Sequence, residues 1–155
     1  MQQREVMFPV EILLVEDNRG DARLAIEALK DGKVRNRITV VTDGEQALQY
    51  LNACHPYTQA VRPELVLLDL NLPRKDGWQV LAAMRADPIL GSIPVAILTG
   101  SAAEQDVIKG YRLKATGYIV KPVDVEQLLA VVASVADFWI SVVNVHESGV
   151  AGAVA

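Results

Sequence analysis

Acidic, hydroxyl and basic side chains stand at the ends of several short apolar runs in this sequence, where a charge is costly to bury without a partner. They are Glu16, Asp17, Asp69, Thr99 and Lys121. Three carboxylates brought close together repel one another and need a counter-charge. Mg²⁺ suits that place, because it is bound by one or two carboxylates and keeps waters or phosphate oxygens as its other ligands. The residue types therefore predict a magnesium site with a lysine beside it.

A carboxylate in such a setting can act as a nucleophile toward phosphorus. Asp69, held beside the metal and Lys121, would form an aspartyl-phosphate. The lysine is a compact positive charge suited to phosphate, and with the metal it would stabilise the charge spread over the phosphoryl oxygens. The hydroxyl of Thr99 can hydrogen-bond a phosphoryl oxygen once the group is attached. The predicted chemistry is therefore phosphorylation of an aspartate.

The elements that must position these residues follow a strand–helix repeat. Short apolar runs predict five strands, at residues 12–15, 38–41, 65–68, 93–98 and 117–120. Amphipathic stretches predict three helices between them, at residues 22–29, 44–51 and 78–85, and capping residues predict two more, from Ser101 and from Asp124. The pattern is (βα)5, an α/β fold with a parallel sheet and helices on both faces. Ligands of such sheets bind beyond the carboxyl ends of the strands, which is where the polar residues stand.

Composition bounds what the chain can be. Its 155 residues fit one domain, and 51% hydrophobic residues are enough for a core. The formal net charge of −4 disfavours nucleic acid as a partner, because phosphate binding needs clustered Lys and Arg. Cys54 is the single cysteine, which excludes an internal disulfide and fits a reducing cytosol. Neither a membrane helix nor a signal peptide is predicted, so we expect a cytoplasmic protein.

Four motifs carry a resemblance to a known family. They are LLVEDN at residues 13–18, LLDLNLPRKDG at 67–77, ILTGS at 97–101 and GYIVKP at 117–122. In this order they resemble the receiver domain of response regulators in two-component signalling. The resemblance implies a flavodoxin-like, doubly wound fold whose five-stranded parallel sheet has the order 2-1-3-4-5.

The resemblance also assigns a role to each residue at the strand ends. Asp69 is the expected phosphoacceptor. Asp17 and Asp69 would bind Mg²⁺ through their side chains, Asn71 through its backbone carbonyl and Glu16 through a water molecule. Lys121 matches the phosphate-binding lysine of the family. A receiver catalyses only its own phosphorylation and dephosphorylation, so the chain is not expected to be an enzyme for outside substrates.

Two further residues match the switch of the family. Thr99 and Tyr118 correspond to the switch pair, in which phosphorylation draws the hydroxyl toward the phosphoryl group and lets the tyrosine move inward. The Lys121–Pro122 peptide bond is cis in that family, and that geometry places the lysine.

A finer resemblance concerns the partner. EDNRGDARLAIEALK, DGEQALQYL, the extended loop before Pro63 and FWISVV are similar to the single-domain regulators paired with phytochrome-type histidine kinases. The resemblance implies that such a kinase is the phosphodonor and that the output passes through protein–protein contacts.

The last predicted helix is apolar on most of its circumference, which one face of a sheet cannot cover. We therefore expect a homodimer through the fourth helix, the fifth strand, the fifth helix and the tail. The expected interface residues are Leu128, Val132, Val135, Phe138 and Trp139. Residues 8–141 would form the receiver domain, and residues 142–155 a tail that is partly a dimer arm and partly disordered.

Two other functions are compatible with parts of the pattern. An aspartate-nucleophile phosphohydrolase of the haloacid-dehalogenase type also uses Asp, Mg²⁺ and Lys, but it needs a second acid where Asn71 stands. A docking module that works without phosphorylation would be expected to lack one or more of the residues needed for phosphorylation. All four of those residues are present: Asp17, Asp69, Thr99 and Lys121.

Overall fold

The computed structural model describes residues 9–32, 34–100, 117–121 and 123–145, the last ten of them (136–145) as backbone only. Five parallel strands form one sheet in the order β2-β1-β3-β4-β5. The strands are β1 (Val10–Val15), β2 (Asn36–Val41), β3 (Leu65–Asp69), β4 (Val95–Thr99) and β5 (Gly117–Val120). The predicted sheet and its strand order are confirmed.

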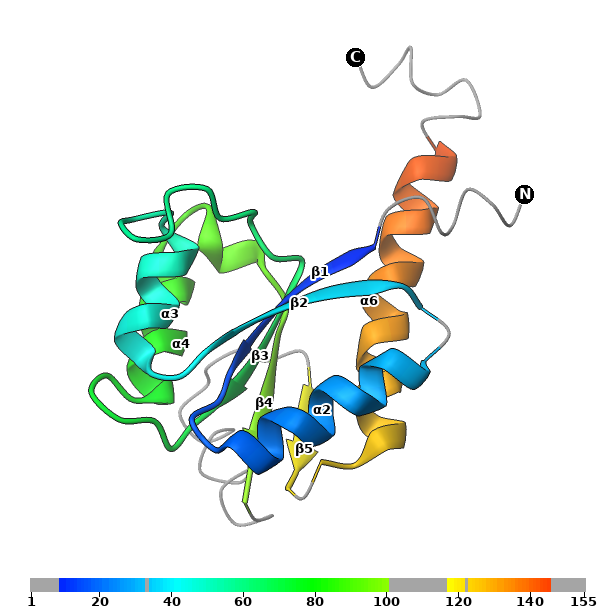
Figure 1. The fold of residues 1–155 in the computed structure, drawn as a ribbon. Helices are drawn as coiled ribbons and strands as arrows, with labels where there is room; N and C mark the ends of the chain where they lie inside the picture. Colours follow the sequence, from blue (N-terminus) through cyan, green and yellow to red (C-terminus); the bar gives the residue numbers. More distant parts are fainter. Residues whose placement is uncertain (1–8, 33, 101–116, 122, 146–155) are drawn as a thin grey trace.

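Helices cover both faces of the sheet (Figure 1). They are α2 (Arg19–Asp31), α3 (Gly44–Leu51), α4 (Gly77–Ala86) and α6 (Val125–Val145), with a short 3₁₀ turn η1 (Leu90–Ser92) before β4. One face carries α2 and α6, and the other carries α3 and α4. The helix predicted to begin at Ser101 falls outside the described residues.

The sheet divides the core into two layers. Strand β3 is buried along its whole length and supplies side chains to both layers alternately, Leu65 and Leu67 to one and Val66 and Leu68 to the other. Burial of one such side chain is worth roughly 1.5–3 kcal/mol. Because both faces of this strand are covered, its apolar run is continuous rather than alternating.

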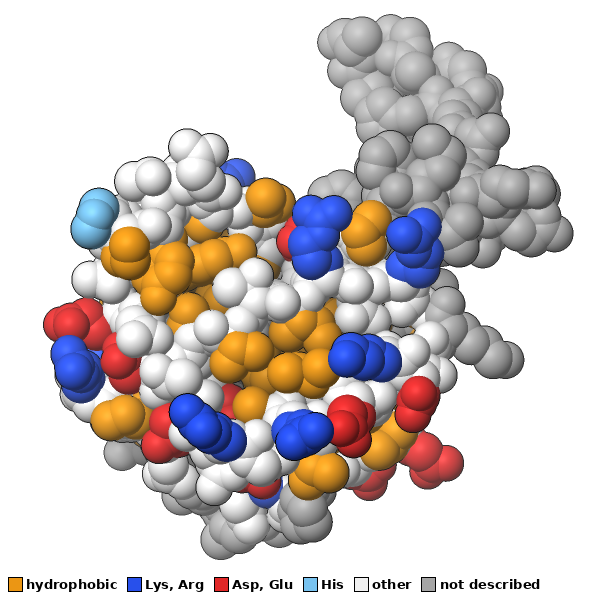
Figure 2. Space-filling view, in the orientation of Figure 1, with side chains coloured by type: hydrophobic (Ala, Val, Ile, Leu, Met, Phe, Trp, Pro, Cys, Tyr) orange, Lys and Arg blue, Asp and Glu red, His pale blue; other side chains and the backbone are white. Residues whose placement is uncertain are grey.

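The edge strand β2 is less covered than the central strands. Of its six residues only Val41 is buried, and Val40 is 38% exposed. Figure 2 shows hydrophobic side chains reaching the surface among Lys and Arg on this side of the molecule.

Local capping residues move some element boundaries from their predicted places. Helix α2 begins at Arg19, earlier than predicted, because Asn18 Oδ1 accepts a hydrogen bond from the backbone N–H of Asp21 at 2.9 Å. Strand β4 begins only at Val95, because Pro94 has no N–H to offer the ladder. The predicted cap Asp124 is confirmed, since its carboxylate accepts from the N–H of Gln127 at 3.1 Å.

The prediction for helix α6 is wrong at three residues. Leu128, Val132 and Val135 were expected in a dimer interface, but each is at most 5% exposed within the single chain. Their spacing puts them on one stripe of the helix, which packs against the sheet and α2. A side chain buried in its own core offers no surface to a partner. The side chains of Phe138 and Trp139 lie outside the described part.

Within the described residues, none of the helices combines the length and the hydropathy required to span a bilayer.

Candidate functional site

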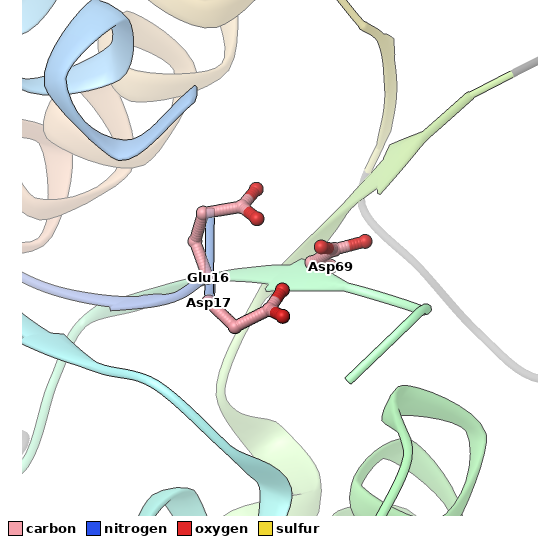
Figure 3. Close-up of side chains that lie close together, drawn as sticks. All are labelled: Glu16, Asp17 and Asp69. Carbon is pink, nitrogen blue, oxygen red and sulfur yellow. The ribbon is translucent and has the colours of Figure 1, made fainter. Parts of the chain in front are cut away.

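The predicted polar residues meet at the carboxyl edge of the sheet. Glu16 and Asp17 follow β1, Asp69 ends β3, and Lys121 follows β5. One carboxylate oxygen from each of Glu16, Asp17 and Asp69 lies within 4.8 Å of the other two. Figure 3 shows these three side chains gathered at neighbouring strand ends. Parallel strands that lie side by side therefore bring together acids 52 or more positions apart in sequence.

Both oxygens of the buried Asp69 carboxylate have partners. Oδ1 accepts a hydrogen bond from the backbone N–H of Asn71 at 3.1 Å, and Oδ2 lies 2.9 Å from Lys121 Nζ. The turn after β3 then closes with a hydrogen bond from the N–H of Gly77 to the carbonyl of Leu70 at 3.0 Å. The carboxylate is thus fixed by its own loop on one side and by a cation on the other.

A glycine is required where this loop meets helix α4. A Cβ atom on Gly77 would lie 2.4 Å from the carbonyl oxygen of Asp69 and 2.6 Å from the Cα of Leu70. Both are backbone atoms, which cannot turn aside as a flexible side chain can. Gly77 therefore lets the start of α4 lie directly against the residue expected to carry the phosphoryl group.

Lys121 is the cation of the site and touches three acids. Its Nζ lies 2.8 Å from Glu16 Oε1, 2.9 Å from Asp69 Oδ2 and 3.2 Å from Asp21 Oδ2. Its backbone N–H donates to the carbonyl of Thr99 at 2.7 Å, which anchors the lysine at the end of the sheet. The side chain is mostly buried, and its three N–H donors match three carboxylates.

Asp21 belongs to this group of contacts although the sequence pattern did not indicate it. It lies in the first turn of α2, where an acid is already favourable to the helix, so its type gave no reason to assign it another role. The available signal was its place one helical turn beyond the Glu16–Asp17 pair, which puts it beside the same sheet edge.

Burial sets the charge state of Glu16. The side chain is 1% exposed, and burial raises its pKa from 4.5 to about 7, with Asp69 adding to the rise and Lys121 opposing it. One oxygen, Oε2, accepts from the N–H of Asn18 at 3.1 Å. The other, Oε1, meets Lys121 as an ion pair without the directed geometry of a hydrogen bond. That oxygen has capacity left for a further positive partner.

The pKa of Lys121 moves in the opposite sense to the effect of burial. Burial alone would lower the pKa of Lys121, but the adjacent carboxylates of Glu16 and Asp69 outweigh that effect, and the pKa is raised. The ammonium therefore stays charged through the neutral range.

The donor set fits a divalent cation of the hard, oxygen-binding kind. Three carboxylates face one lysine, so negative charge is left over at the edge of the sheet. Asp17 is exposed while Glu16 and Asp69 are buried, so such an ion would meet protein on one side and solvent on the other. The choice of Mg²⁺, the water link to Glu16 and the carbonyl of Asn71 as a ligand stay predictions.

The two expected switch residues lie on neighbouring strands. Thr99 ends β4, buried, and Tyr118 stands on β5 opposite Ile97. Because alternate residues of a strand share a face, Ile97 and Thr99 lie on one face, and Tyr118 packs partly buried in the same core layer as Ile97. The arrangement suits a switch pair, while the predicted cis bond before Pro122 falls outside the described residues.

The comparisons with known proteins agree on one protein family. A family model described as the response regulator receiver domain matches residues 12–133. The response regulator Rcp1 of Synechocystis sp. is 40% identical over 136 residues, which make up 88% of this chain and 92% of that protein.

Solved structures agree with this result. The bacteriophytochrome response regulator RtBRR is 42% identical, with a TM-score of 0.77, over 83% of this chain and 78% of that one. The phosphorylated cyanobacterial phytochrome response regulator RcpA is 43% identical, with a TM-score of 0.71, over 87% of this chain and 96% of that one. The Mn²⁺-bound form of Rcp1 is 41% identical, with a TM-score of 0.70, over 84% of this chain and 94% of that one.

Proposed function

The chain belongs to the response regulator receiver family, and from this membership we propose that it accepts a phosphoryl group on Asp69 from a phytochrome-type histidine kinase. The observation that carries the assignment to Asp69 is its position. Asp69 is the buried carboxylate that accepts a hydrogen bond from Lys121 and belongs to the group of acids able to hold a cation. Glu16 shares the lysine and the group, but its contact with Lys121 is an ion pair without hydrogen-bond geometry. The phytochrome link is supported by the likeness to RcpA, RtBRR and Rcp1.

The residues of the site divide the transfer between them. An oxygen of Asp69 forms a bond to phosphorus as the P–N bond of the phosphohistidine breaks, and the electron pair of that bond returns to the imidazole nitrogen. Lys121 holds positive charge beside the phosphoryl oxygens, and the hydroxyl of Thr99 donates a hydrogen bond to one of them. A bound Mg²⁺, held by Asp17, Asp69 and the Asn71 carbonyl, would supply further positive charge to these oxygens.

The phosphorylated state ends by hydrolysis. Water attacks phosphorus, the bond to the Asp69 oxygen breaks, and the carboxylate and inorganic phosphate are released. Turnover of outside substrates in the manner of the haloacid dehalogenases would need an acid in place of Asn71, whose amide side chain is exposed and cannot serve as a general acid. We therefore propose signalling rather than hydrolysis as the function, with output through protein contacts.

The proposal is tested by incubating the protein with acetyl phosphate and Mg²⁺ and recording its intact mass. We expect one adduct of roughly 80 Da, which is absent from Asp69→Asn. The control is Asp31→Asn, which changes an exposed acid at the far end of α2 and should label like the parent. No adduct under conditions in which an established receiver labels, or an adduct that persists in Asp69→Asn, would contradict the assignment.

The phytochrome link has its own test. A phytochrome-type kinase that has autophosphorylated on histidine should pass its phosphoryl group to this protein faster than a histidine kinase of another class does. Equal or slower transfer from the phytochrome-type kinase would contradict the link while leaving Asp69 as the acceptor.

A further inference from the structure

We infer that Asp21 is a positioning residue for Lys121, one that keeps the ammonium group beside the phosphorylation site when the neighbouring carboxylates are engaged elsewhere. The inference rests on the proposed phosphorylation of Asp69. Its basis is the 3.2 Å distance between Asp21 Oδ2 and Lys121 Nζ, from a helix that carries none of the three cation-binding acids.

The contact between Asp21 and Lys121 is part of a closed ring of hydrogen bonds and ion pairs. The N–H of Asn18 donates to Glu16 Oε2 at 3.1 Å, and Asn18 Oδ1 accepts from the N–H of Asp21 at 2.9 Å. Asp21 Oδ2 pairs with Lys121 Nζ at 3.2 Å, and the same nitrogen returns to Glu16 Oε1 at 2.8 Å. The residue that caps α2 therefore also fixes the backbone from which Asp21 reaches the lysine.

Asp21 differs from the other two partners of Lys121 in what else it can bind. Glu16 and Asp69 belong, with Asp17, to the group of carboxylates able to hold one cation, and Asp21 does not. A carboxylate that ligates a divalent cation loses attraction for a nearby ammonium, since the two positive charges repel. Phosphorylation of Asp69 moves the negative charge from that carboxylate to the phosphoryl oxygens. Among the carboxylates that Lys121 contacts in the described part of the chain, Asp21 is then the one that still holds the ammonium from the side of α2.

The environment allows this pair to be stronger than an ordinary surface ion pair. The side chains of Lys121 and Asp21 are 18% and 26% exposed, so solvent screens them only in part. Asp21 is also stabilised by the positive end of the α2 dipole, which holds the anion in place without another cation. A fixed partner lowers the conformational freedom that a lysine must lose in order to bind a phosphoryl group.

Two measurements on Asp21→Asn test the inference. At saturating Mg²⁺ and acetyl phosphate, we expect the phosphorylation rate constant to fall about 3- to 30-fold, because the ammonium is no longer held in place. In calorimetric titration of the metal-free protein, we expect Mg²⁺ to bind about 2- to 10-fold more weakly, because Lys121 then rests on Glu16 and Asp69 alone and competes with the ion. Asp21→Glu, which keeps the charge, should recover part of both losses.

The control is Glu27→Gln on the same helix, which removes an acid that pairs, within the described residues, with the exposed Arg23 and should leave both quantities unchanged. The decisive comparison adds Lys121→Ala. If Asp21 acts through the lysine, Asp21→Asn has little further effect on rate or Mg²⁺ affinity in that background.

Equal losses in both backgrounds, or no loss in either, would overturn the inference. The parent protein reports separately on the proposed function. A parent that labels alongside an Asp21→Asn variant that labels equally fast contradicts the role of Asp21 alone, whereas a parent that fails to label contradicts the phosphorylation itself.

Discussion

At the scale of single residues, the site is governed by an excess of carboxylates over cations. Lys121 compensates part of the negative charge of Glu16 and Asp69, yet the pKa of Glu16 is still raised to about 7 because the side chain is withdrawn from water. In the metal-free protein, Glu16 is therefore protonated in a large fraction of molecules near neutral pH. A cation that binds here favours the ionised form, and its affinity must rise as pH rises through 7.

The raised pKa of Glu16 predicts how stability depends on pH. The folded state binds this proton more tightly than the unfolded state, whose pKa is 4.5, so the free energy of unfolding falls as pH rises from about 4.5 to about 7 and levels off above. The full shift corresponds to a loss of roughly 3 kcal/mol. Urea unfolding in EDTA between pH 5 and pH 8 measures this loss of stability, and the same measurement on Glu16→Gln serves as the comparison.

Glu16→Gln should flatten this pH dependence, because glutamine does not titrate. Saturating Mg²⁺ at pH 8 should restore more stability to the parent protein than to the variant, since only the parent has a carboxylate at position 16. If parent and variant lose the same free energy between pH 5 and pH 8, Glu16 does not titrate in this range and the assignment of its pKa is wrong.

At the scale of elements, the site depends on how closely helix α4 approaches the end of β3. The N–H of Gly77 donates to the carbonyl of Leu70 at 3.0 Å, and a side chain on Gly77 has no room against the backbone of Asp69 and Leu70. The capping box of Asp76 and Gln79 fixes the start of the helix at the same place. The position of Asp69 thus depends on the close approach of α4 that Gly77 permits.

Gly77→Ala should therefore be destabilising, although alanine favours helices. We expect a loss of about 1–3 kcal/mol in the free energy of unfolding, because the backbone must move to admit the methyl group. Phosphorylation by acetyl phosphate should slow as Asp69 moves with the loop. Gly91→Ala is the control, since its nearest atoms would lie 3.4 Å from the new Cβ and nothing needs to shift. Equal stability of the two variants would show that the loop yields without cost.

The elements also show where sequence reasoning succeeds. Continuous apolar runs ending in polar residues predicted β1, β3 and β5 and the convergence of Glu16, Asp69 and Lys121, because parallel strands carry their ends to one edge. Asp21 was missed because an acid in the first turn of a helix already has an ordinary explanation there. Only the distance to Lys121, set by the packing of α2 on the sheet, distinguishes it.

At the scale of the whole molecule, helix α6 shows why a hydrophobic pattern alone does not identify an interface. The stripe of Leu128, Val132 and Val135 looked like surplus apolar surface, yet it fills the core layer between the sheet and α2. The pattern of an isolated helix does not say which of its stripes the rest of the chain covers. What remains on the described surface of α6 is small or polar, apart from Val125 at 47% exposure and the partly buried Leu129 and Val131.

The homodimer therefore stays a proposal that depends on the sequence after Val135, where Phe138 and Trp139 stand. Light scattering on the eluting protein should give about twice the chain mass of 16.9 kDa at micromolar concentration. Trp139→Glu should give the monomer mass, because a charge in an apolar interface must be desolvated. Val40→Glu, on the edge strand β2 at the opposite end of the sheet, should leave the dimer intact. A monomeric parent would exclude the dimer. Dissociation by Val40→Glu but not by Trp139→Glu would instead place the contact on β2.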